Sequence, residues 1–451
     1  MEQTTKRSSF SGKLGIVLAA AGSAVGLGNI WRFPYLAAKY GGGIFLLCYL
    51  ILAVTFGFAL MVAEIAIGRK TRQSAIHAYG VLDKRFRFLG PLASLVPIII
   101  TPYYCVIGGW VIKYLFVYAT GNGAVLTDSN YFGSFISSVS PIVWFIIFVL
   151  ITAIIVMTGV EKGIEKVSKF MMPLLVILSI GIAVYCLTLP GAIDGVIYYL
   201  KPDFSKFSMT TVLAAMGQLF YSMSLAMGIM ITYGSYMKKD SHLTASVHQI
   251  EIFDTGIAFL AGLMIIPAVF SFTGGADINA GPGLMFITLP KVFGSIAITN
   301  IIGVLFFVLV IFAALTSAIS LMETVVSIIC DKTGMKRLAS CIVTTIGIIA
   351  LGSLSALGYG VLAQVQIIGM AFLDFFDFIS NSVLMPVVAL LTCILVGYVI
   401  KPAALIEEAE AEGASFKGKK LFVVVIKYIA PVCIIAILIT SVLSAFGFIS
   451  I

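Results

Sequence analysis

The chain has 451 residues, of which 60% are hydrophobic and only 11% are charged. A soluble globular domain carries roughly 25% charged residues, so this composition excludes an ordinary soluble globule and predicts a protein embedded in lipid. The formal net charge of +8 does not indicate a nucleic-acid partner, because in a membrane protein the placement of lysine and arginine matters more than their sum.

In chain order, long apolar segments alternate with short polar stretches. A helix needs about 20 apolar residues to cross about 30 Å of hydrocarbon, and eleven segments have about this length. We expect membrane spans at 13–37, 43–68, 90–118, 141–159, 168–189, 210–236, 243–273, 297–329, 339–357, 366–399 and 421–448. The polar start, Met1 to Gly12, precedes a long apolar run without a processing site, so we expect no cleavable signal peptide.

Lysine and arginine are distributed unequally between the two ends of these spans. If the N-terminus is cytoplasmic, the outward-facing basic residues are only Arg32, Lys39, Lys113, Lys201, Lys206 and Lys291. The positive-inside rule therefore predicts a multi-pass protein of the cell inner (plasma) membrane, with the N-terminus in the cytoplasm and the C-terminus outside. The acidic stretch 407–412 then falls in a cytoplasmic loop, where we expect a solvated linker helix.

The first span contains residues that destabilise a helix. Between Ala21 and Pro34 it holds Gly22, Gly26 and Gly28 together with an asparagine and an arginine. Unwound backbone survives at membrane depth only where it lines a cavity or is buried in protein, and its free carbonyls can bind a cation. A close-packing face formed by Gly22 and Gly26 is the alternative, whereas a nucleotide-binding loop is disfavoured because no strand precedes the glycines.

The sixth span has a matching interruption. From Gly217 to Gly228 it is rich in small and polar residues. Two interrupted helices at corresponding positions predict a transporter built from an inverted repeat, with its substrate between the breaks. We therefore expect one transmembrane transporter domain, 1–451, in which 13–189 and 210–399 are the two repeats and 421–448 is an extra helix.

Several strings along the chain resemble the signatures of the neurotransmitter:sodium symporters. They are the run from Gly26 to Pro34, the triplet Gly41 to Gly43, Glu64 with Gly68 and Arg69, the pair Tyr103 and Tyr104, the triplet Ile231 to Tyr233, and the triplet Leu315 to Ser317. The eleven-span form resembles the bacterial branch that moves hydrophobic and aromatic amino acids. The resemblance implies an all-α membrane protein with a leucine-transporter-type five-plus-five inverted repeat and broken first and sixth helices. It also implies a sodium-coupled symporter that imports a neutral L-amino acid by alternating access, and no enzymatic activity.

The resemblance implies two sodium sites. The first would take the Ala24 carbonyl, the Asn29 side-chain oxygen, the carbonyl and hydroxyl of Ser222, Asp254 and the carboxylate of the substrate itself. The second would take the carbonyls of Gly22, Val25 and Ala313 with the hydroxyls of Thr316 and Ser317. Without the family, these hydroxyls are ordinary helix hydroxyls that bond to the preceding turn.

The substrate contacts also follow from the resemblance. Monoamine carriers of the family have an aspartate where this chain has Gly26, so an α-carboxylate has room here. It would lie against the amides of Leu27 and Gly28, at the positive end of a half-helix, and accept from the Tyr104 hydroxyl. The amino group would meet Ala24, Phe220, Ser222 and Ser224, and the side chain would meet Ile100, Tyr104, Phe220, Met227, Ala318 and Leu321. Each of these residues, taken singly, could equally be a packing residue.

Ionisable residues inside a membrane are costly, and their usual explanation is function. By resemblance, Arg32 would pair with Asp377 over a lid of Tyr104 and Phe220. At the cytoplasmic end, Arg7 would pair with Asp331 beside Tyr236. We expect Glu64 to cap unwound amides, and we assign no role to Glu251 or Glu323.

The chain departs from the family pattern near the first sodium site. Asp254 stands where many members have asparagine, and Ala258 replaces the serine of chloride-dependent members or the glutamate of others. We therefore expect transport without chloride. The expected partners are a small amino acid and the lipid bilayer. The alternatives are a sodium-selective channel and a membrane protein that senses amino acids without transporting them.

Overall fold

The computed structural model describes residues 9–274, 282–295 and 298–446. Eight continuous helical stretches are long and apolar enough to cross a membrane: Gly43–Thr71, Lys84–Ala119, Val160–Leu187, Leu243–Thr273, Thr299–Thr333, Arg337–Leu357, Phe372–Val399 and Lys419–Ala445. A ninth span is the bent pair of Lys13–Ala24 and Gly28–Lys39. The two remaining expected spans are α8 (Pro141–Met157) and the divided pair α11 (Met209–Ser222) and α12 (Ile229–Tyr236). The described part of the chain is therefore an all-helical membrane fold.

Most long stretches consist of several consecutive helical elements. The first two spans are α1 (Lys13–Ala24), η1 (Gly28–Arg32) and α2 (Phe33–Lys39), then α3 (Gly43–Leu52), η2 (Ala53–Gly57) and α4 (Phe58–Thr71). The middle spans include η3 (Lys84–Phe86), α6 (Leu89–Ala119), η5 (Val160–Glu165), α9 (Lys166–Leu187), α13 (Leu243–Thr273), α15 (Thr299–Thr333) and α16 (Arg337–Leu357). The last two are α17 (Phe372–Asp377), η8 (Phe378–Leu384), α18 (Met385–Ile394) and η9 (Leu395–Val399), then α20 (Lys419–Val424), η11 (Val425–Ile429) and α21 (Ala430–Ala445).

Short helices form the connections between spans. They are α5 (Ala75–Leu82), η4 (Gly123–Thr127), α7 (Tyr131–Ile136), α10 (Ala192–Leu200), η6 (Phe204–Lys206), η7 (Leu284–Thr288), α14 (Leu289–Gly294), α19 (Ala403–Ala409) and η10 (Ala411–Gly413). The expected fifth span begins earlier than predicted, at Val160, and the tenth begins later, at Phe372. The eleven predicted spans otherwise match the helices to within a few residues.

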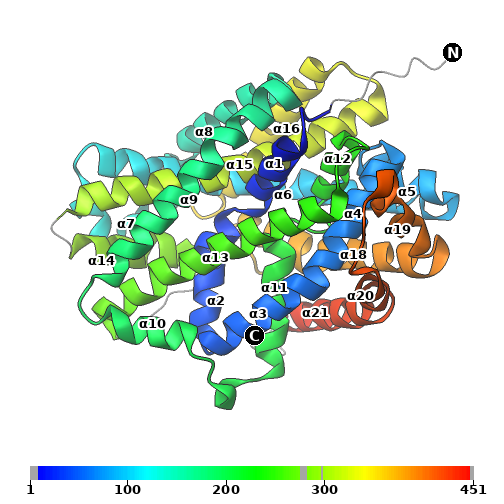
Figure 1. Cartoon of the computed structure of the whole chain (residues 1–451). Helices are drawn as coiled ribbons and strands as arrows, with labels where there is room; N and C mark the ends of the chain where they lie inside the picture. Colours follow the sequence, from blue (N-terminus) through cyan, green and yellow to red (C-terminus); the bar gives the residue numbers. More distant parts are fainter. Residues whose placement is uncertain (1–8, 275–281, 296–297, 447–451) are drawn as a thin grey trace.

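The broken first span lies in the core of the molecule. In Figure 1, α1 and α13 lie in its middle and α21 lies at its edge. The α1 helix packs against α13, α15 and α9, and α6 packs against α15, α8 and α16. The small residues of α1, from Ala19 to Ala24, are all buried. Small side chains allow close helix approach in membranes, so this packing places the break of the first span at the centre.

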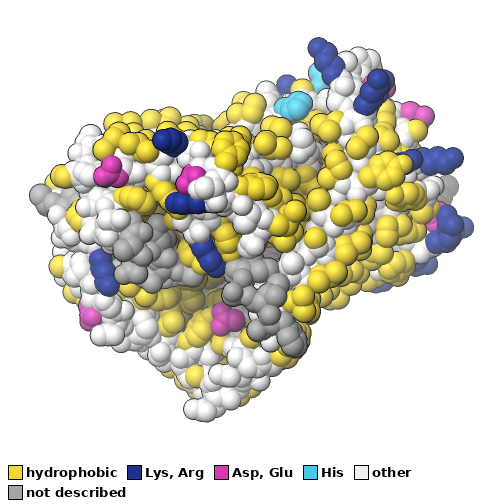
Figure 2. Space-filling view, turned by 90° about the horizontal axis from the view of Figure 1, so that it is seen from below, with side chains coloured by type: hydrophobic (Ala, Val, Ile, Leu, Met, Phe, Trp, Pro, Cys, Tyr) yellow, Lys and Arg dark blue, Asp and Glu magenta, His cyan; other side chains and the backbone are white. Residues whose placement is uncertain are grey.

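In Figure 2 the surface is apolar over a broad area, with lysines and arginines at the right-hand end and a few more over the left half. Many large hydrophobic side chains are exposed, among them Ile154 at 63%, Phe170 at 65%, Ile252 at 69% and Val432 at 68%. A soluble monomer rarely exposes such continuous apolar area. These side chains face lipid.

The loop between the tenth and eleventh spans differs from the prediction. The stretch 407–412 was expected to be solvated, but Glu408 is only 6% exposed and pairs with Arg69, which is 1% exposed, at 2.8 Å between Oε1 and Nε. Lys239 Nζ lies 3.4 Å from the other carboxylate oxygen. The guanidinium at the end of α4 is buried and needs a counter-charge, so α19 is held against α4.

This buried pair generates a prediction. Glu408→Ala should destabilise the protein by about 3–5 kcal/mol, because it leaves the Arg69 charge buried without a partner. Glu410→Ala is the matched control, since Glu410 pairs with Lys419 at 3.2 Å near the surface, and an exposed pair contributes about 0–1 kcal/mol. Unfolding of the purified variants in detergent measures both, and equal losses would contradict a structural role for Glu408.

Candidate functional site

The first break begins where α1 ends at Ala24 and continues until the helix resumes at Gly28, with a 52° bend between the two parts. Val25 is extended, at φ −73° and ψ 98°. An added Cβ at position 26 would lie 2.6 Å from the Ser317 hydroxyl oxygen, so a larger residue there would force the Ser317 side chain to shift. The Gly26 N–H donates to the Asn29 side-chain oxygen at 3.0 Å. A side chain three residues along the same span thus satisfies a backbone amide of the unwound segment.

The second break separates α11 from α12 and has a left-handed backbone. Ser224 and Ala226 have φ values of 52° and 58°, a conformation that costs a non-glycine residue about 1–2 kcal/mol. The Ala226 N–H donates to Glu64 Oε1 at 2.6 Å. This contact confirms that Glu64 caps unwound amides. The hydrogen bond offsets part of the cost of the left-handed backbone at Ser224 and Ala226.

The two breaks face each other. The Ser224 hydroxyl donates to the Ser23 carbonyl at 3.1 Å, and the Asn29 amide donates to the Ser222 hydroxyl at 3.0 Å. A small cavity of about 30 Å³ lies between them. It is lined by Ser23, Ala24, Gly26, Leu27, Gly28, Asn29, Ile100, Tyr104, Tyr221, Ser222, Ser224, Met227, Ile229, Ser317 and Leu321.

Most of the predicted substrate contacts line this cavity, but Phe220 and Ala318 do not. The Phe220 ring instead packs on Phe56 with centroids 5.3 Å apart. Its neighbour Tyr221 lines the cavity, where Phe220 was predicted to be. On α15 the neighbouring Ser317 lines the cavity while Ala318 is buried outside it. Consecutive side chains on a helix point about 100° apart. A prediction that is one residue out of register therefore names a side chain that points away from the cavity.

Three of the residues proposed for the first sodium site, Asn29, Ser222 and Asp254, come together at one point of the structure. The Asn29 side-chain N–H₂ group lies 3.0 Å from Ser222 Oγ, 3.1 Å from the Asp254 carbonyl and 2.7 Å from Asp254 Oδ1. Ser222 Oγ also donates to Asp254 Oδ1 at 2.7 Å. The sequence analysis missed Tyr49, whose hydroxyl donates to Asp254 Oδ2 at 3.2 Å; a buried tyrosine usually finds a hydrogen-bond partner.

The proposed second set also converges, between the first and eighth spans. Ser317 Oγ lies 3.3 Å from the Gly22 carbonyl and 3.4 Å from the Val25 carbonyl. Thr316 Oγ1 lies 3.2 Å from the Ala313 carbonyl. The structure therefore brings the Gly22 and Val25 carbonyls to the Ser317 hydroxyl, and it adds the Ser23 carbonyl at 3.0 Å from Ser317 Oγ. The Thr316 hydroxyl bonds to its own preceding turn, with the Phe312 carbonyl at 2.9 Å.

The outer pair of predicted gate residues is not joined directly. No ion pair links Arg32 to Asp377, although both belong to the described residues. Asp377 accepts from Tyr103 at 3.2 Å and from Asn381 at 2.6 Å. The Arg32 guanidinium instead lies over the Tyr221 ring, 5.4 Å from its centroid. The guanidinium is thus held on the side chain that covers the cavity.

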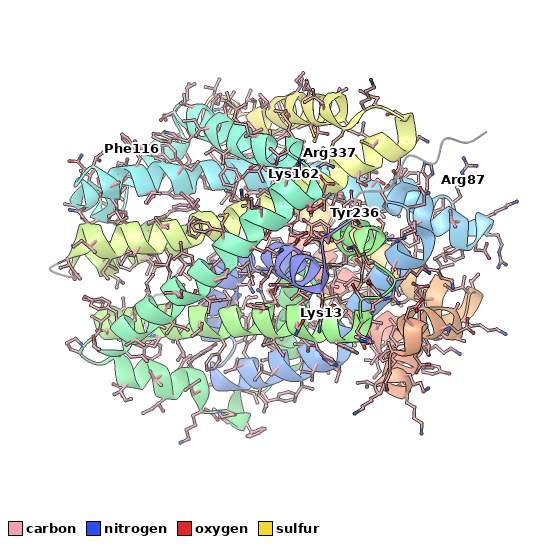
Figure 3. All side chains as sticks on the ribbon, turned by 45° about the horizontal axis from the view of Figure 1, so that its top comes forward. Lys13, Arg87, Phe116, Lys162, Tyr236 and Arg337 are labelled. Atoms are coloured by element: carbon pink, nitrogen blue, oxygen red, sulfur yellow. The ribbon has the colours of Figure 1, made fainter. Side chains whose placement is uncertain are left out.

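At the other end, Arg7 lies outside the described residues. Asp331 accepts the Ser74 backbone N–H at 2.8 Å. Tyr236 donates to Glu323 at 2.8 Å, and Glu323 pairs with Arg337 at 2.5 Å. Figure 3 labels Tyr236 and Arg337 close together, in the half of the molecule opposite Phe116. The structure thus gives Glu323, which had no assigned role, a place beside Tyr236.

Comparison with known proteins decides the family. The profile of the sodium:neurotransmitter symporter family matches residues 7–130 and 124–447. The chain belongs to the sodium:neurotransmitter symporter family. It is 35% identical to an uncharacterized sodium-dependent transporter of Haemophilus influenzae, over 97% of this chain and 98% of the relative. It is 36% identical to the uncharacterized sodium-dependent transporter YhdH of Bacillus subtilis, over 95% and 96%.

A solved member of the family shares the fold. The crystal structure of MhsT in complex with L-phenylalanine superposes with a TM-score of 0.87 at 37% sequence identity, covering 96% of this chain and all of that one. The human sodium- and chloride-dependent GABA transporter 2 is 26% identical, over 73% of this chain and 62% of the relative. The chain is thus a sodium-dependent transporter with the leucine-transporter-type fold.

The contact between Glu64 and the second break gives a prediction. Glu64→Ala should destabilise the fold by about 1–3 kcal/mol, because the buried Ala226 N–H loses its acceptor. Glu64→Gln retains a side-chain carbonyl oxygen and is the matched control, with a smaller loss expected. Chemical unfolding of the two variants measures the difference, and an alanine variant as stable as the glutamine variant would show that the cap is unimportant.

Proposed function

We propose that this protein is a sodium-coupled symporter that imports a neutral, hydrophobic or aromatic L-amino acid by alternating access. The observation that carries the proposal is the cavity between the two helix breaks. Its lining combines unwound backbone and hydroxyl groups with the apolar side chains of Ile100, Met227, Ile229 and Leu321. A zwitterion with an apolar side chain combines polar and apolar groups in the same way.

The carboxylate of the substrate would lie at the start of the resumed first helix. There the amides of Leu27 and Gly28 form the positive end of a half-helix. The Leu27 N–H donates to the Tyr104 hydroxyl at 3.4 Å, which places this hydroxyl beside the amides where the carboxylate would bind. The amino group would meet the carbonyls of Ala24 and Ser222 and the hydroxyl of Ser224.

The side chain of the substrate would contact the apolar side chains of the cavity and Tyr221. None of the described residues that line the cavity has an ionised side chain, and burying an unpaired charge is expensive, which favours a neutral substrate. Met227 adds a flexible and polarizable surface that suits bulky side chains. The structure of MhsT with L-phenylalanine, at 37% identity, supports an aromatic or large aliphatic substrate.

The first sodium ion would occupy the place towards which the Asn29 amide N–H₂ now points. Three oxygens already surround that point, from Ser222 and Asp254. If the Asn29 side-chain amide rotated by 180°, its oxygen would replace its N–H₂ group at this point. The substrate carboxylate would then complete the set of sodium ligands. Ion and substrate would then share one ligand, which couples their binding.

The second sodium ion would join the first span to the eighth. Carbonyls from the end of α1 face the Ser317 hydroxyl from the middle of α15 there. Binding at this point would hold α1 against α15, and loss of the ion would release α1. The proposal places the basic end of Figure 2 in the cytoplasm, following the positive-inside rule.

The sodium ligands can be tested one site at a time. Asn29→Ala and Thr316→Ala each remove one polar side chain from a different proposed site, so both should lose sodium-dependent uptake while remaining folded. Thr344→Ala is the matched control, because this buried hydroxyl on α16 bonds only to the preceding turn, at 2.8 Å from the Ser340 carbonyl. Sodium binding to the purified variants is the direct measurement. Wild-type binding by both site variants would refute the assignment.

Chloride independence is a second prediction. Two sodium ions beside a zwitterion leave excess positive charge in a dry site, where an uncompensated charge is expensive, and the Asp254 carboxylate balances it. Replacing chloride with gluconate should therefore leave uptake by the natural protein unchanged. The double variant Asp254→Asn with Ala258→Ser should become chloride-responsive. Strong chloride dependence of the natural protein would contradict the role of Asp254.

A further inference from the structure

Three titratable residues follow one another along α13 at intervals of three. His248, Glu251 and Asp254 are 60%, 4% and 0% exposed, respectively. Residues three apart lie on neighbouring positions of a helix surface and about 4.5 Å apart along its axis. The row therefore leads from an exposed imidazole to the carboxylate of the proposed first sodium site.

Glu251 has few partners for a buried carboxyl group. Its Oε2 lies 3.5 Å from His248 Nδ1, and its Oε1 has no hydrogen-bond partner among the described residues. Three other buried glutamates each have a basic partner: Glu165 with Lys169, Glu323 with Arg337, and Glu408 with Arg69. Glu64 has none, but its carboxyl caps the Ala226 amide.

The surrounding elements bring no basic side chain to Glu251 within ion-pair distance in the described part of the chain. From α4, the Phe58 ring stacks on His248 with centroids 4.3 Å apart, while Glu64 and Arg69 of that helix are held by Ala226 and Glu408. From α9 and η5, Lys169 and Glu165 pair with each other. From α3, the Tyr49 hydroxyl faces Asp254. Lys13 stands exposed at the start of α1.

We propose that Glu251 is a proton-binding site that sodium empties, with His248 as the route between Glu251 and the surface. This inference rests on the proposed sodium symport. An intramembrane carboxylate without a counter-charge is expensive, whereas the protonated carboxyl is neutral. When no cation is bound beside Asp254, Glu251 holds a proton. A sodium ion bound one step along the helix compensates the carboxylate charge and repels the proton, so sodium entry drives the proton out.

The transfer is a simple acid–base exchange. The Glu251 carboxyl gives its proton to the neutral His248 imidazole at Nδ1, which leaves a carboxylate and an imidazolium. The exposed imidazolium then releases a proton to water and returns to its neutral form. The carrier thereby exchanges one proton for sodium without any redox or covalent step.

Proton release on addition of sodium tests the proposal. Purified full-length protein in weakly buffered detergent should release protons to a pH indicator dye when NaCl is added, and not when KCl is added. Glu251→Gln should abolish this release yet remain stabilised by sodium in a thermal unfolding assay. Glu251→Asp retains a carboxyl and should still release protons. His248→Gln should slow the release without changing its amount, and His242→Gln, an exposed histidine at the start of the same helix, should leave both unchanged.

Sodium titrations at several pH values give a second readout. One competing proton raises the half-saturating sodium concentration by up to about tenfold for each pH unit of acidification, and Glu251→Gln should remove this dependence. Wild-type proton release or wild-type pH dependence in Glu251→Gln would overturn the proposal, because the proton would then reside elsewhere. Release from His248→Gln at the wild-type rate would overturn the route. If sodium neither stabilises the natural protein nor releases protons from it, the proposed symport itself fails.

Discussion

A helix that breaks inside a membrane leaves peptide groups that lipid cannot hydrogen-bond, and this protein contains two such breaks at its centre. Their polar groups are satisfied by one another and by a few buried side chains. Gly26 binds the Asn29 side chain, Ser224 binds the Ser23 carbonyl, and Ala226 binds Glu64. The same arrangement leaves other carbonyls and hydroxyls facing a cavity. The proposed ion sites thus arise from the way the fold compensates for interrupted helices.

The buried charges follow a comparable pattern. Arg69 and Arg337 each have a glutamate partner on another element, so these charges hold α4 to α19 and α16 to α15. Asp254 differs, because it is surrounded by hydroxyl and amide groups and not by a cation. Glu251 has only the exposed His248 imidazole nearby, at 3.5 Å. These two carboxyl groups on α13 have no lysine or arginine partner among the described residues, and they are therefore the places where a mobile cation or a proton would contribute most.

The sequence was sufficient for the spans and for the positions of both breaks, because apolar length and clustered glycine act locally. It was also sufficient for most of the cavity lining and for the cap at Glu64. Phe220 and Ala318 do not line the cavity, because a shift of one residue along a helix turns the side chain by about 100°. The buried Glu408 was missed because its solvation depends on Arg69, which is distant in sequence. Tyr49 and Tyr221 were missed for the same reason, because their partners come from other spans.

The central claim is that sodium and a neutral amino acid bind together between the two breaks, and thermal unfolding tests it most directly. Ligands that bind only the folded protein raise its unfolding midpoint by mass action. A screen of the twenty amino acids in sodium and in potassium should show stabilisation by hydrophobic or aromatic L-amino acids in sodium alone. Equal stabilisation in potassium, or the strongest stabilisation by a charged amino acid, would contradict the account.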